Sequence, residues 1–311
     1  MGTEGLREDQ PLPNALPELL KLPFVSTGAF KTRSVRECVE WALSGRLDRI
    51  ELGSGSHWTS DILQPIRETS GRPIRYLVHN YFPPHEQPFV LNLASSDPEA
   101  LERSLAHCRW AIDLSVELCA PFFSVHAGFA FNAKPEHLGR DVTQVPRMML
   151  EQAHENFVCS IKELCAYASR QGVTLAVENN VIASFNLVNG KNMVGLCATA
   201  DEILRTYEEV GASNLSFLID VGHLKVTATS LGFDRHAFLD RVSPHIVAFH
   251  LSDNDGLADQ NRPFDEQAWF MPRLVDFPNA TMVLEAYDLD LDRIREQCRV
   301  ITQARNRTVS V

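Results

Sequence analysis

Residues 215–223 of this chain read LSFLIDVGH, an apolar run that ends abruptly in Asp220. Three further segments have the same form, and each ends in a side chain of a metal-binding type: Ala176-Val177-Glu178-Asn179, Phe249-His250-Leu251-Ser252-Asp253 and Val283-Leu284-Glu285. If these runs are neighbouring strands, Glu178, Asp220, His250 and Glu285 surround one point. Carboxylates with one imidazole suit a hard-to-borderline divalent ion such as Mn, Co, Zn or Mg. The sequence therefore predicts one divalent-metal site.

The rest of the chain indicates which fold holds these strands. Helix-period stretches such as Pro98–Cys119 and Arg147–Gln171 alternate with β-branched or aromatic runs. Eight such runs can be identified: Phe24–Phe30, Arg49–Gly55, Arg75–Phe82, Phe122–Gly128, Thr174–Asn180, Leu215–Asp220, Ile246–Ser252 and Thr281–Ala286. This repeat predicts an α/β fold, a single-domain (β/α)8 TIM barrel whose active residues lie at the C-terminal ends of the strands. The rival, a doubly wound open sheet, is disfavoured because no glycine-rich turn follows the first strand.

Composition and the termini set further limits. We expect residues 1–22 to be an N-terminal extension without signal-peptide character and residues 23–311 to be the barrel. No apolar run approaches the ~20 residues of a membrane span. Seven cysteines without a Cys-x-x-Cys pair favour free thiols in a reducing, cytoplasmic compartment. The formal net charge of -11 argues against a general affinity for nucleic acid. A homo-oligomer is compatible with the sequence.

The ordered motifs resemble those of the xylose isomerase-like barrel superfamily, over nearly the whole chain from the first strand onward. The most specific matches are Val177-Glu178-Asn179, Ile219-Asp220-Val221-Gly222-His223, the segment 250–256 (HLSDNDG) and Leu284-Glu285. This superfamily holds sugar isomerases and epimerases, inosose dehydratases, and apurinic endonucleases of the endonuclease four type. The resemblance implies a small carbohydrate as substrate, with the nucleic-acid branch as an alternative.

Two histidines bear on which branch the chain resembles. His79 and His126 end the third and fourth predicted strands. In the endonuclease branch the matching positions hold a second zinc and share the glutamate that corresponds to Glu178. A third zinc in that branch uses the histidine matching His223 and an Asp-x-His pair, but here the sequence is Asp259-Gln260-Asn261. Asparagine is a poor zinc ligand, so the three-metal cluster is expected to be incomplete. His79 and His126 remain candidates for a second metal, a substrate hydrogen bond or a buried structural role.

Other candidates have weaker signals. His223, Glu51, Asp253 and Arg262 are expected to contact substrate, although Glu51 could equally make a structural pair. Four aromatic residues in loops could roof a sugar-sized pocket or pack the helices onto the barrel: Phe129, Phe131, Trp269 and Phe270. The remaining histidines are expected on the solvated surface: His57, His85, His107, His137, His154, His236 and His245.

The expected chemistry rests on two glutamates at one metal. A divalent ion chelated by a ketose carbonyl and hydroxyl would acidify the C–H between them and stabilise an enediolate. Glu178 and Glu285 would then remove and return a proton on the two faces of the carbon, which inverts a stereocentre or moves a carbonyl. Isomerase, epimerase and inosose-type dehydratase activities share this step. A phosphodiesterase that acts on abasic DNA is the alternative from a different class.

Overall fold

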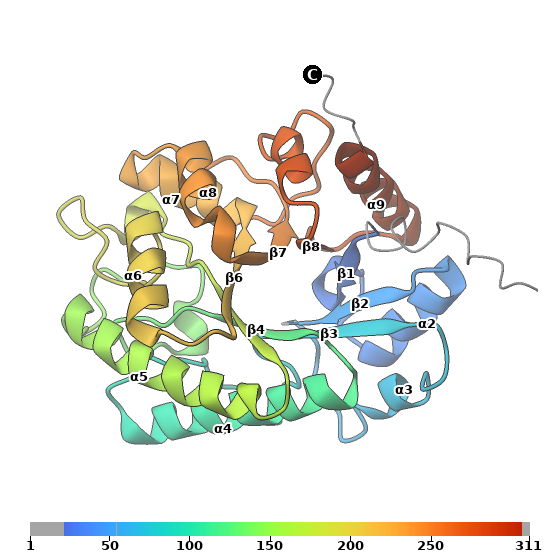
Figure 1. Ribbon diagram of the computed structural model, residues 1–311, viewed down its shortest axis with the longest axis horizontal. Coiled ribbons are helices and arrows are strands. Elements are labelled where there is room, and N and C mark those ends of the chain that lie inside the picture. Colours follow the sequence, from blue (N-terminus) through green and yellow to red (C-terminus); the bar gives the residue numbers. More distant parts are fainter. Residues whose placement is uncertain (1–21, 54, 307–311) are drawn as a thin grey trace, which may run out of the picture.

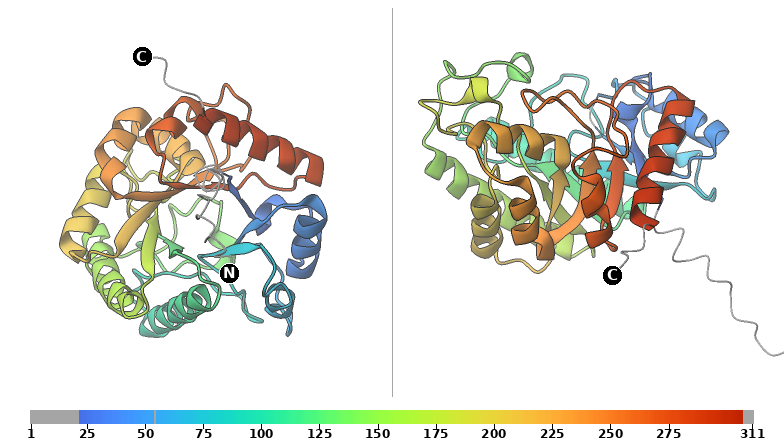
Figure 2. Two further views of the ribbon diagram at one scale, coloured as in Figure 1. Left: turned by 45° about the vertical axis from the view of Figure 1, so that its right-hand side comes forward. Right: turned by 90° about the horizontal axis from the view of Figure 1, so that it is seen from above.

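The computed structural model describes residues 22–53 and 55–306, which form one closed barrel of eight parallel strands in the order β1 to β8. Each strand pairs with the next along the chain, and β1 pairs with β8. The left view of Figure 2 shows the strands as a central ring with helices around it. The strands are β1 (Phe24–Ser26), β2 (Arg49–Leu52), β3 (Arg75–His79), β4 (Phe122–His126), β5 (Thr174–Glu178), β6 (Leu215–Asp220), β7 (Ile246–Leu251) and β8 (Thr281–Leu284). The predicted (β/α)8 fold is thus confirmed.

Helices cover the outside of the barrel (Figure 1). They are α2 (Val35–Gly45), α3 (Gln64–Arg67), α4 (Pro98–Glu117), α5 (Leu150–Ser169), α6 (Ala200–Val210), α7 (Val221–Leu231), α8 (Arg235–Val242) and α9 (Leu291–Asn306). Short 3₁₀ turns lie between them: η1 (Thr27–Ala29), η2 (Pro135–His137), η3 (Ser184–Asn186), η4 (Ser243–His245) and η5 (Met271–Asp276). The connection from β7 to β8 carries only η5, so the expected strand-helix repeat is not regular there.

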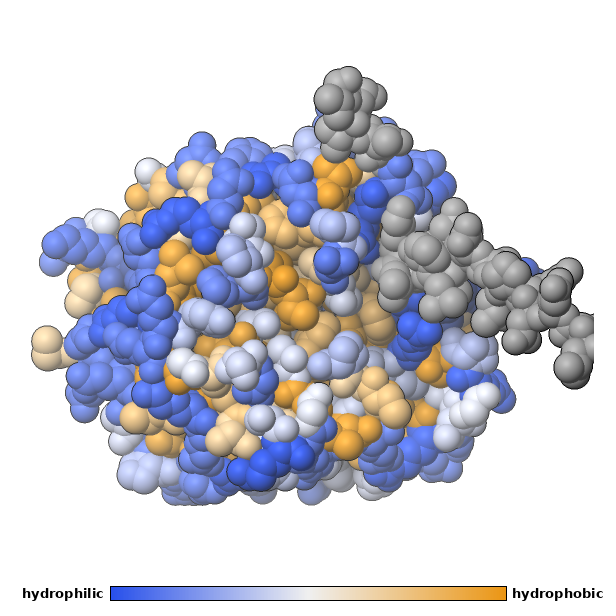
Figure 3. Space-filling view, in the orientation of Figure 1, coloured by the Kyte–Doolittle hydropathy of each residue, from blue (hydrophilic) through white to orange (hydrophobic). Residues whose placement is uncertain are grey.

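Local sequence signals account for the helix ends. At the start of α6 the Thr199 side chain accepts a hydrogen bond from the backbone N–H of Glu202, and the Glu202 side chain accepts one from the backbone N–H of Thr199. Gly211, in the left-handed conformation, ends this helix. Asp97 caps α4, and Pro98 occupies its first turn. The lower edge of the molecule, where α4 lies in Figure 1, is mainly hydrophilic in Figure 3. These helices therefore bury an apolar stripe on the barrel and expose a polar one.

The inside of the barrel is divided into an apolar lower layer and a polar upper layer. Leu77, Ala176, Leu218, Ala248 and Val283 belong to the apolar cluster inside the strands, together with Phe24, Ala120 and Phe122. Side chains alternate along a strand, so the next inward positions are those that follow by two residues. These positions hold polar groups: His79, Ser124, Glu178, Asp220, His250 and Glu285. The apolar layer thus supports a polar layer at the C-terminal ends of the strands.

Several strands are shorter than the sequence predicted. The first run was expected to extend to Phe30, but β1 ends at Ser26 because the Ser26 hydroxyl accepts a bond from Gly28 N–H and starts η1. Strands β2 to β8 end within two residues of their inward polar residue, and β8 ends one residue before Glu285. All seven cysteines are free. Within the described ranges no helix is long and apolar enough to cross a membrane. The predicted extension falls, apart from Leu22, outside the described residues.

Candidate metal centre

The carboxylate of Glu178 lies at the centre of the polar layer and is completely buried. Its Oε2 is 3.3 Å from His79 Nε2 and 3.6 Å from His126 Nδ1. Its Oε1 is 3.3 Å from His223 Nδ1 and 3.6 Å from His250 Nδ1. Neither oxygen accepts a hydrogen bond. A buried carboxylate without donors is costly, so this position calls for a cation.

His250, on β7, stands between two further glutamates. Its Nε2 is 3.0 Å from Glu51 Oε2, and its Nδ1 is 2.7 Å from Glu285 Oε2. A neutral imidazole that donates from Nε2 to Glu51 leaves the Nδ1 lone pair free for a metal. Glu51 therefore lies behind His250 and orients the ring rather than facing the cavity.

Asp220 ends β6 and also caps α7. Its Oδ1 accepts a bond of 2.7 Å from His223 N–H, which is the ordinary role of a helix-capping aspartate. Its Oδ2 has no hydrogen-bond partner and is buried. Asn179 fixes the peptide here, because its Oδ1 accepts from Asp220 N–H at 2.8 Å. A Cβ on Gly222 would lie 2.8 Å from Ser252 Oγ and 3.1 Å from Asp220 Oδ1, so only glycine fits without displacing this carboxylate.

The charges of this layer are unbalanced. Burial raises the pKa of Asp220 to about 7, and the neighbouring carboxylates Glu178 and Glu285 add to the effect of burial. Burial likewise raises the pKa of Glu285. Burial also opposes ionisation of Glu178, but His126, His250 and His79 together hold its pKa well below the usual value. A divalent cation would relieve this repulsion and lower the pKa of the carboxyls that face it.

The residues present fit a divalent ion. Glu178, Asp220, His250 and Glu285 each offer one ligand atom, and these four atoms lie within 4.8 Å of one another. All four side chains are buried. Three carboxylates and one imidazole form a donor set for a divalent ion of the Mn, Co, Zn or Mg type. The buried cluster could therefore hold a metal, and the unpartnered oxygens of Glu178 and Asp220 point to the same position.

A second group of potential ligands adjoins the first. His79, His126 and Glu178 also bring their ligand atoms within 4.8 Å of one another. Ser124 Oγ lies 2.9 Å from His79 Nδ1 and fixes that ring, so Nε2 faces Glu178. Burial lowers the pKa of both His79 and His126, so both rings tend to be neutral. A second metal or a substrate hydrogen bond remains compatible with this arrangement.

The other predicted site residues divide into two groups. His223 contacts the cluster, since its Nδ1 lies 3.3 Å from Glu178 Oε1, and its Nε2 lies 3.3 Å from Asp259 Oδ2. The Asp253 carboxylate instead pairs with Lys225 at 2.7 Å. Arg262 is turned toward Asp255 on the exposed surface, 3.5 Å away. The structure does not bring Asp253 and Arg262 to the cavity over the cluster.

A cavity of about 530 Å³ opens above the polar layer. His126, His223, Asp259, Asn261 and Glu285 form its floor, and Tyr287 also lines it. Sequence reasoning missed Tyr287, and it noted Asp259 only through the segment Asp259-Gln260-Asn261. Because Tyr287 follows β8 in a short polar loop, its position could have been found only from the fold. The expected aromatic roof is half present, since Phe129 and Phe131 line the cavity and Trp269 and Phe270 do not.

Two histidines expected on the surface are in fact buried. His107 on α4 is 2 % exposed, and its Nε2 donates to Asn80 O at 3.0 Å. His154 on α5 is 5 % exposed and lies 2.9 Å from Glu209. The expectation was wrong because each ring lies on the barrel side of its helix and finds a hydrogen-bond partner there. His107 supports the loop that begins at Asn80, which lines the cavity.

The eight-stranded barrel carries a buried carboxylate-histidine cluster at the C-terminal ends of its strands, and comparison with known proteins identifies the family. The family model described as "Xylose isomerase-like TIM barrel" matches residues 45–301. The chain therefore belongs to this family. No curated protein matches the sequence.

Solved structures share the fold. A D-tagatose 3-epimerase-like protein is 17% identical with a TM-score of 0.68, over 91% of this chain and 96% of that chain. The 3-keto-D-glucoside 4-epimerase from E. coli is 12% identical with a TM-score of 0.61, over 91% and 98%. A Thermus thermophilus protein soaked with ZnCl2 is 20% identical with a TM-score of 0.56, over 92% and 99%. At these identities the likeness establishes the fold alone.

Proposed function

We propose that the protein is a divalent-metal-dependent isomerase or epimerase that acts on a small carbohydrate. The observation that carries the proposal is the convergence of four ligand atoms within 4.8 Å, where Glu178 and Asp220 each have at least one buried oxygen without a hydrogen-bond donor. This cluster lies at the floor of a cavity at the C-terminal end of the barrel, where TIM-barrel enzymes have their active sites. Proteins of known structure with this fold include a 3-keto-D-glucoside 4-epimerase and an L-ribulose 3-epimerase, which supports the same substrate class.

The residues of the cluster would have two roles, to bind the ion and to transfer a proton. Asp220 and His250 would hold the ion, with one oxygen each from Glu178 and Glu285. A bound divalent ion would supply Lewis-acid polarisation of a substrate carbonyl. Glu178 comes from β5 and Glu285 follows β8, so they approach the cavity from different sides of the barrel. One carboxylate would take a proton from the carbon beside the carbonyl, and the other would return one to the opposite face.

The neighbouring residues would position these groups. Glu51 accepts from His250 Nε2 and keeps Nδ1 directed at the cluster. His223, close to Asp259, would orient a substrate hydroxyl at the floor of the cavity. Ser252 Oγ donates to Asn261 Oδ1 at 3.2 Å and helps to fix the loop that carries Asp259.

Phosphodiester hydrolysis is the second candidate, and the group His79, His126 and Glu178 favours it. Two features oppose it. The Asn261 side chain is already bonded to Ser252 and Asp259, so it does not complete a third metal site. The formal net charge of -11 disfavours binding to a polyanion. The same three residues serve the first proposal equally well as supports for Glu178.

The test combines metal analysis with two substrate panels. The purified protein is loaded with Mn, Co, Zn or Mg and assayed by NMR for solvent-deuterium incorporation into a panel of ketoses. The same samples are assayed for cleavage of a duplex with one abasic site. We expect about one metal per chain and deuterium exchange beside a ketose carbonyl. Abasic cleavage without exchange, with two or three metals per chain, would replace the proposal by the second candidate.

A further inference from the structure

The cavity over the cluster is polar at its floor and apolar along its walls. The walls come from two long connections, residues 127–149 between β4 and α5 and residues 179–199 between β5 and α6. We use the name apolar wall for six of the apolar residues that they contribute to the lining: Phe129, Phe131, Leu138, Val142, Ile182 and Phe185. The two connections are joined by a hydrogen bond of 2.9 Å from Val142 N–H to Asn186 Oδ1 and by a backbone bridge between Phe129 and Gly195. The wall is therefore a built part of the cavity.

Core packing explains the buried residues of the apolar wall, but it does not explain the exposed ones. Phe131, Val142 and Ile182 are at most 6% exposed and form the small core that holds the two connections together. Leu138 and Phe185 line the same cavity but are 56% and 41% exposed. Exposed apolar side chains that continue a cavity are typical of a ligand-binding surface. Leu138 and Phe185 therefore expose apolar surface that a ligand in the cavity could contact.

The charges of the cavity disfavour phosphorylated carbohydrates. Arg140 is the single Lys or Arg among the described residues that line the cavity, and it is exposed. Near the floor lie the carboxylates of Glu178, Glu285 and Asp259. Recognition of a phosphate ester needs several charge-assisted donors, usually from arginine or lysine. A substrate without a phosphate is therefore favoured.

We propose that the substrate is an uncharged carbohydrate with an apolar aryl or alkyl substituent, whose reacting carbons lie at the cluster and whose substituent lies against Leu138 and Phe185. This inference rests on the proposed function and narrows its substrate class. The cavity of about 530 Å³ is within the ~300–1,000 Å³ of sites that enclose a drug-sized ligand. A bare monosaccharide at the floor would leave the apolar wall in contact with water.

The first experiment measures binding without turnover. Calorimetric titration of the metal-loaded protein compares three probes: phenyl β-D-glucoside, methyl β-D-glucoside and glucose 6-phosphate. We expect the phenyl glucoside to bind about tenfold or more tighter than the methyl glucoside, since each methylene in an apolar pocket is worth roughly tenfold or more. Glucose 6-phosphate should bind more weakly than the methyl glucoside. Equal affinities for the two glucosides, or tightest binding of the phosphate, would overturn the inference.

Substitutions test whether the preference for the phenyl glucoside depends on the apolar wall. Leu138→Ala and Phe185→Ala should each weaken phenyl glucoside binding several-fold and leave methyl glucoside binding unchanged. Val116→Ala is the matched control, because Val116 is also 40% exposed but lies on α4 away from the cavity. A loss of phenyl selectivity in the control, or none in either wall variant, contradicts the assignment.

A separate readout distinguishes this inference from the proposed function. Solvent-deuterium exchange into D-fructose tests the proposed proton transfer alone. The ratio of exchange into an aryl-substituted keto-sugar to exchange into D-fructose tests the contribution of the apolar wall. Exchange into both substrates at equal kcat/KM would refute the inference and leave the proposed function standing. Phenyl-selective binding without exchange into any ketose would refute the proposed function and leave a binding site.

Discussion

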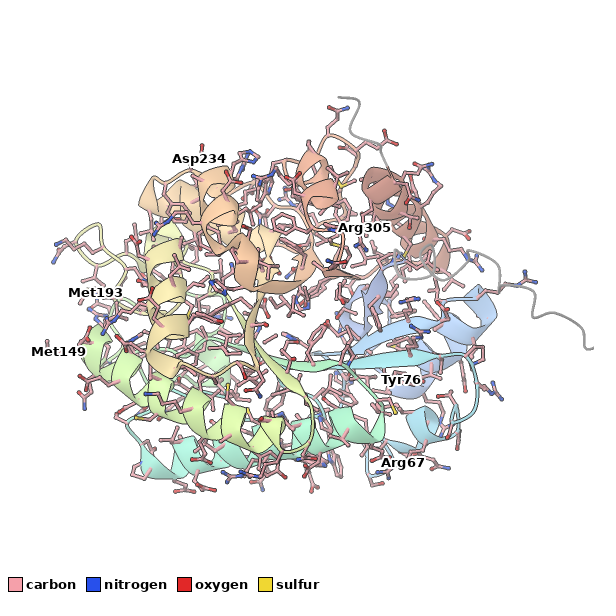
Figure 4. The ribbon with its side chains drawn as sticks, viewed as in Figure 1. Arg67, Tyr76, Met149, Met193, Asp234 and Arg305 are labelled. Carbon is pink, nitrogen blue, oxygen red and sulfur yellow. The ribbon has the colours of Figure 1, made fainter. Side chains whose placement is uncertain are left out.

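The two ends of the barrel both carry cavities, but their linings have opposite character. The cavity at the C-terminal end of the strands is about 530 Å³ and ends on buried carboxylates and histidines. The cavity at the N-terminal end is about 730 Å³ and is lined by arginines such as Arg49, Arg72 and Arg75. In Figure 4 the labelled Met149 and Met193 mark the connections at the C-terminal end, and Arg67 and Tyr76 lie toward the opposite end.

The larger cavity is therefore not the one that lies over the candidate metal cluster. At the N-terminal end the inward positions of the strands hold apolar residues such as Leu77, Ala176 and Val283. At the C-terminal end the next inward positions hold His79, Glu178 and Glu285, and both carboxylate oxygens of Glu178 lack a hydrogen-bond partner. The difference shows that ligand-type side chains at consecutive strand ends, and not cavity size, mark the candidate site.

Asp220→Ala should produce the largest effect. It deletes a charged ligand, so we expect the bound metal to fall to near zero and turnover to fall below detection, measured by elemental analysis and deuterium exchange. Asp234→Ala is the matched control, because Asp234, which is labelled in Figure 4, caps α8 as Asp220 caps α7. The control should lose some stability with its helix cap and keep its metal. Full metal occupancy in Asp220→Ala would break the comparison between the two ends.

Glu285→Gln should have the next largest effect. The amide keeps an oxygen for the ion but cannot take up a proton, so turnover should fall by ~10²-fold or more while metal content falls modestly. Turnover and metal content are measured on the same samples. Nearly intact turnover would contradict the paired-glutamate mechanism and favour hydrolysis by an activated water.

His107 predicts a pH dependence of stability. Burial lowers the pKa of His107 from its usual 6.5 to about 4. Between these values the unfolded chain binds a proton at His107 and the folded chain does not, so stability should rise with pH across this window. The contribution, about 3 kcal/mol, is lost as the pH falls toward 4. The free energy of unfolding is measured against pH for the wild type and His107→Gln, and parallel curves would refute the interpretation.

Arg67→Ala, at the opposite end, should have the smallest effect. Arg67 forms two bonds with Glu117, of 2.7 and 3.1 Å, but both side chains are largely exposed. Water screens such an exposed pair, so the unfolding midpoint should shift only slightly and turnover should not change. A fall in turnover would show that the two ends are coupled.

Much of the fold could be read from the sequence because its signals are local. Short apolar runs, and the polar residues that interrupt them, predict the eight strands and their order. They also predict the polar residue near the end of each strand. The strand ends were less predictable, as at β1, because a single hydroxyl bond decides where the ladder stops. Asp253 and Arg262 follow a strand-end motif in sequence, yet they pair with Lys225 and Asp255 instead of facing the cavity.

The sequence by itself determined the barrel and the four ligand-type residues Glu178, Asp220, His250 and Glu285, because each lies at a strand end that periodicity locates. Only the tertiary structure decided which oxygens lack partners, how Glu51 orients His250, and that His107 and His154 are buried. It also decided that Leu138 and Phe185 share one cavity with Glu285. Such contacts join residues far apart in the chain, and they depend on loop conformation and on helix rotation, neither of which a local pattern specifies.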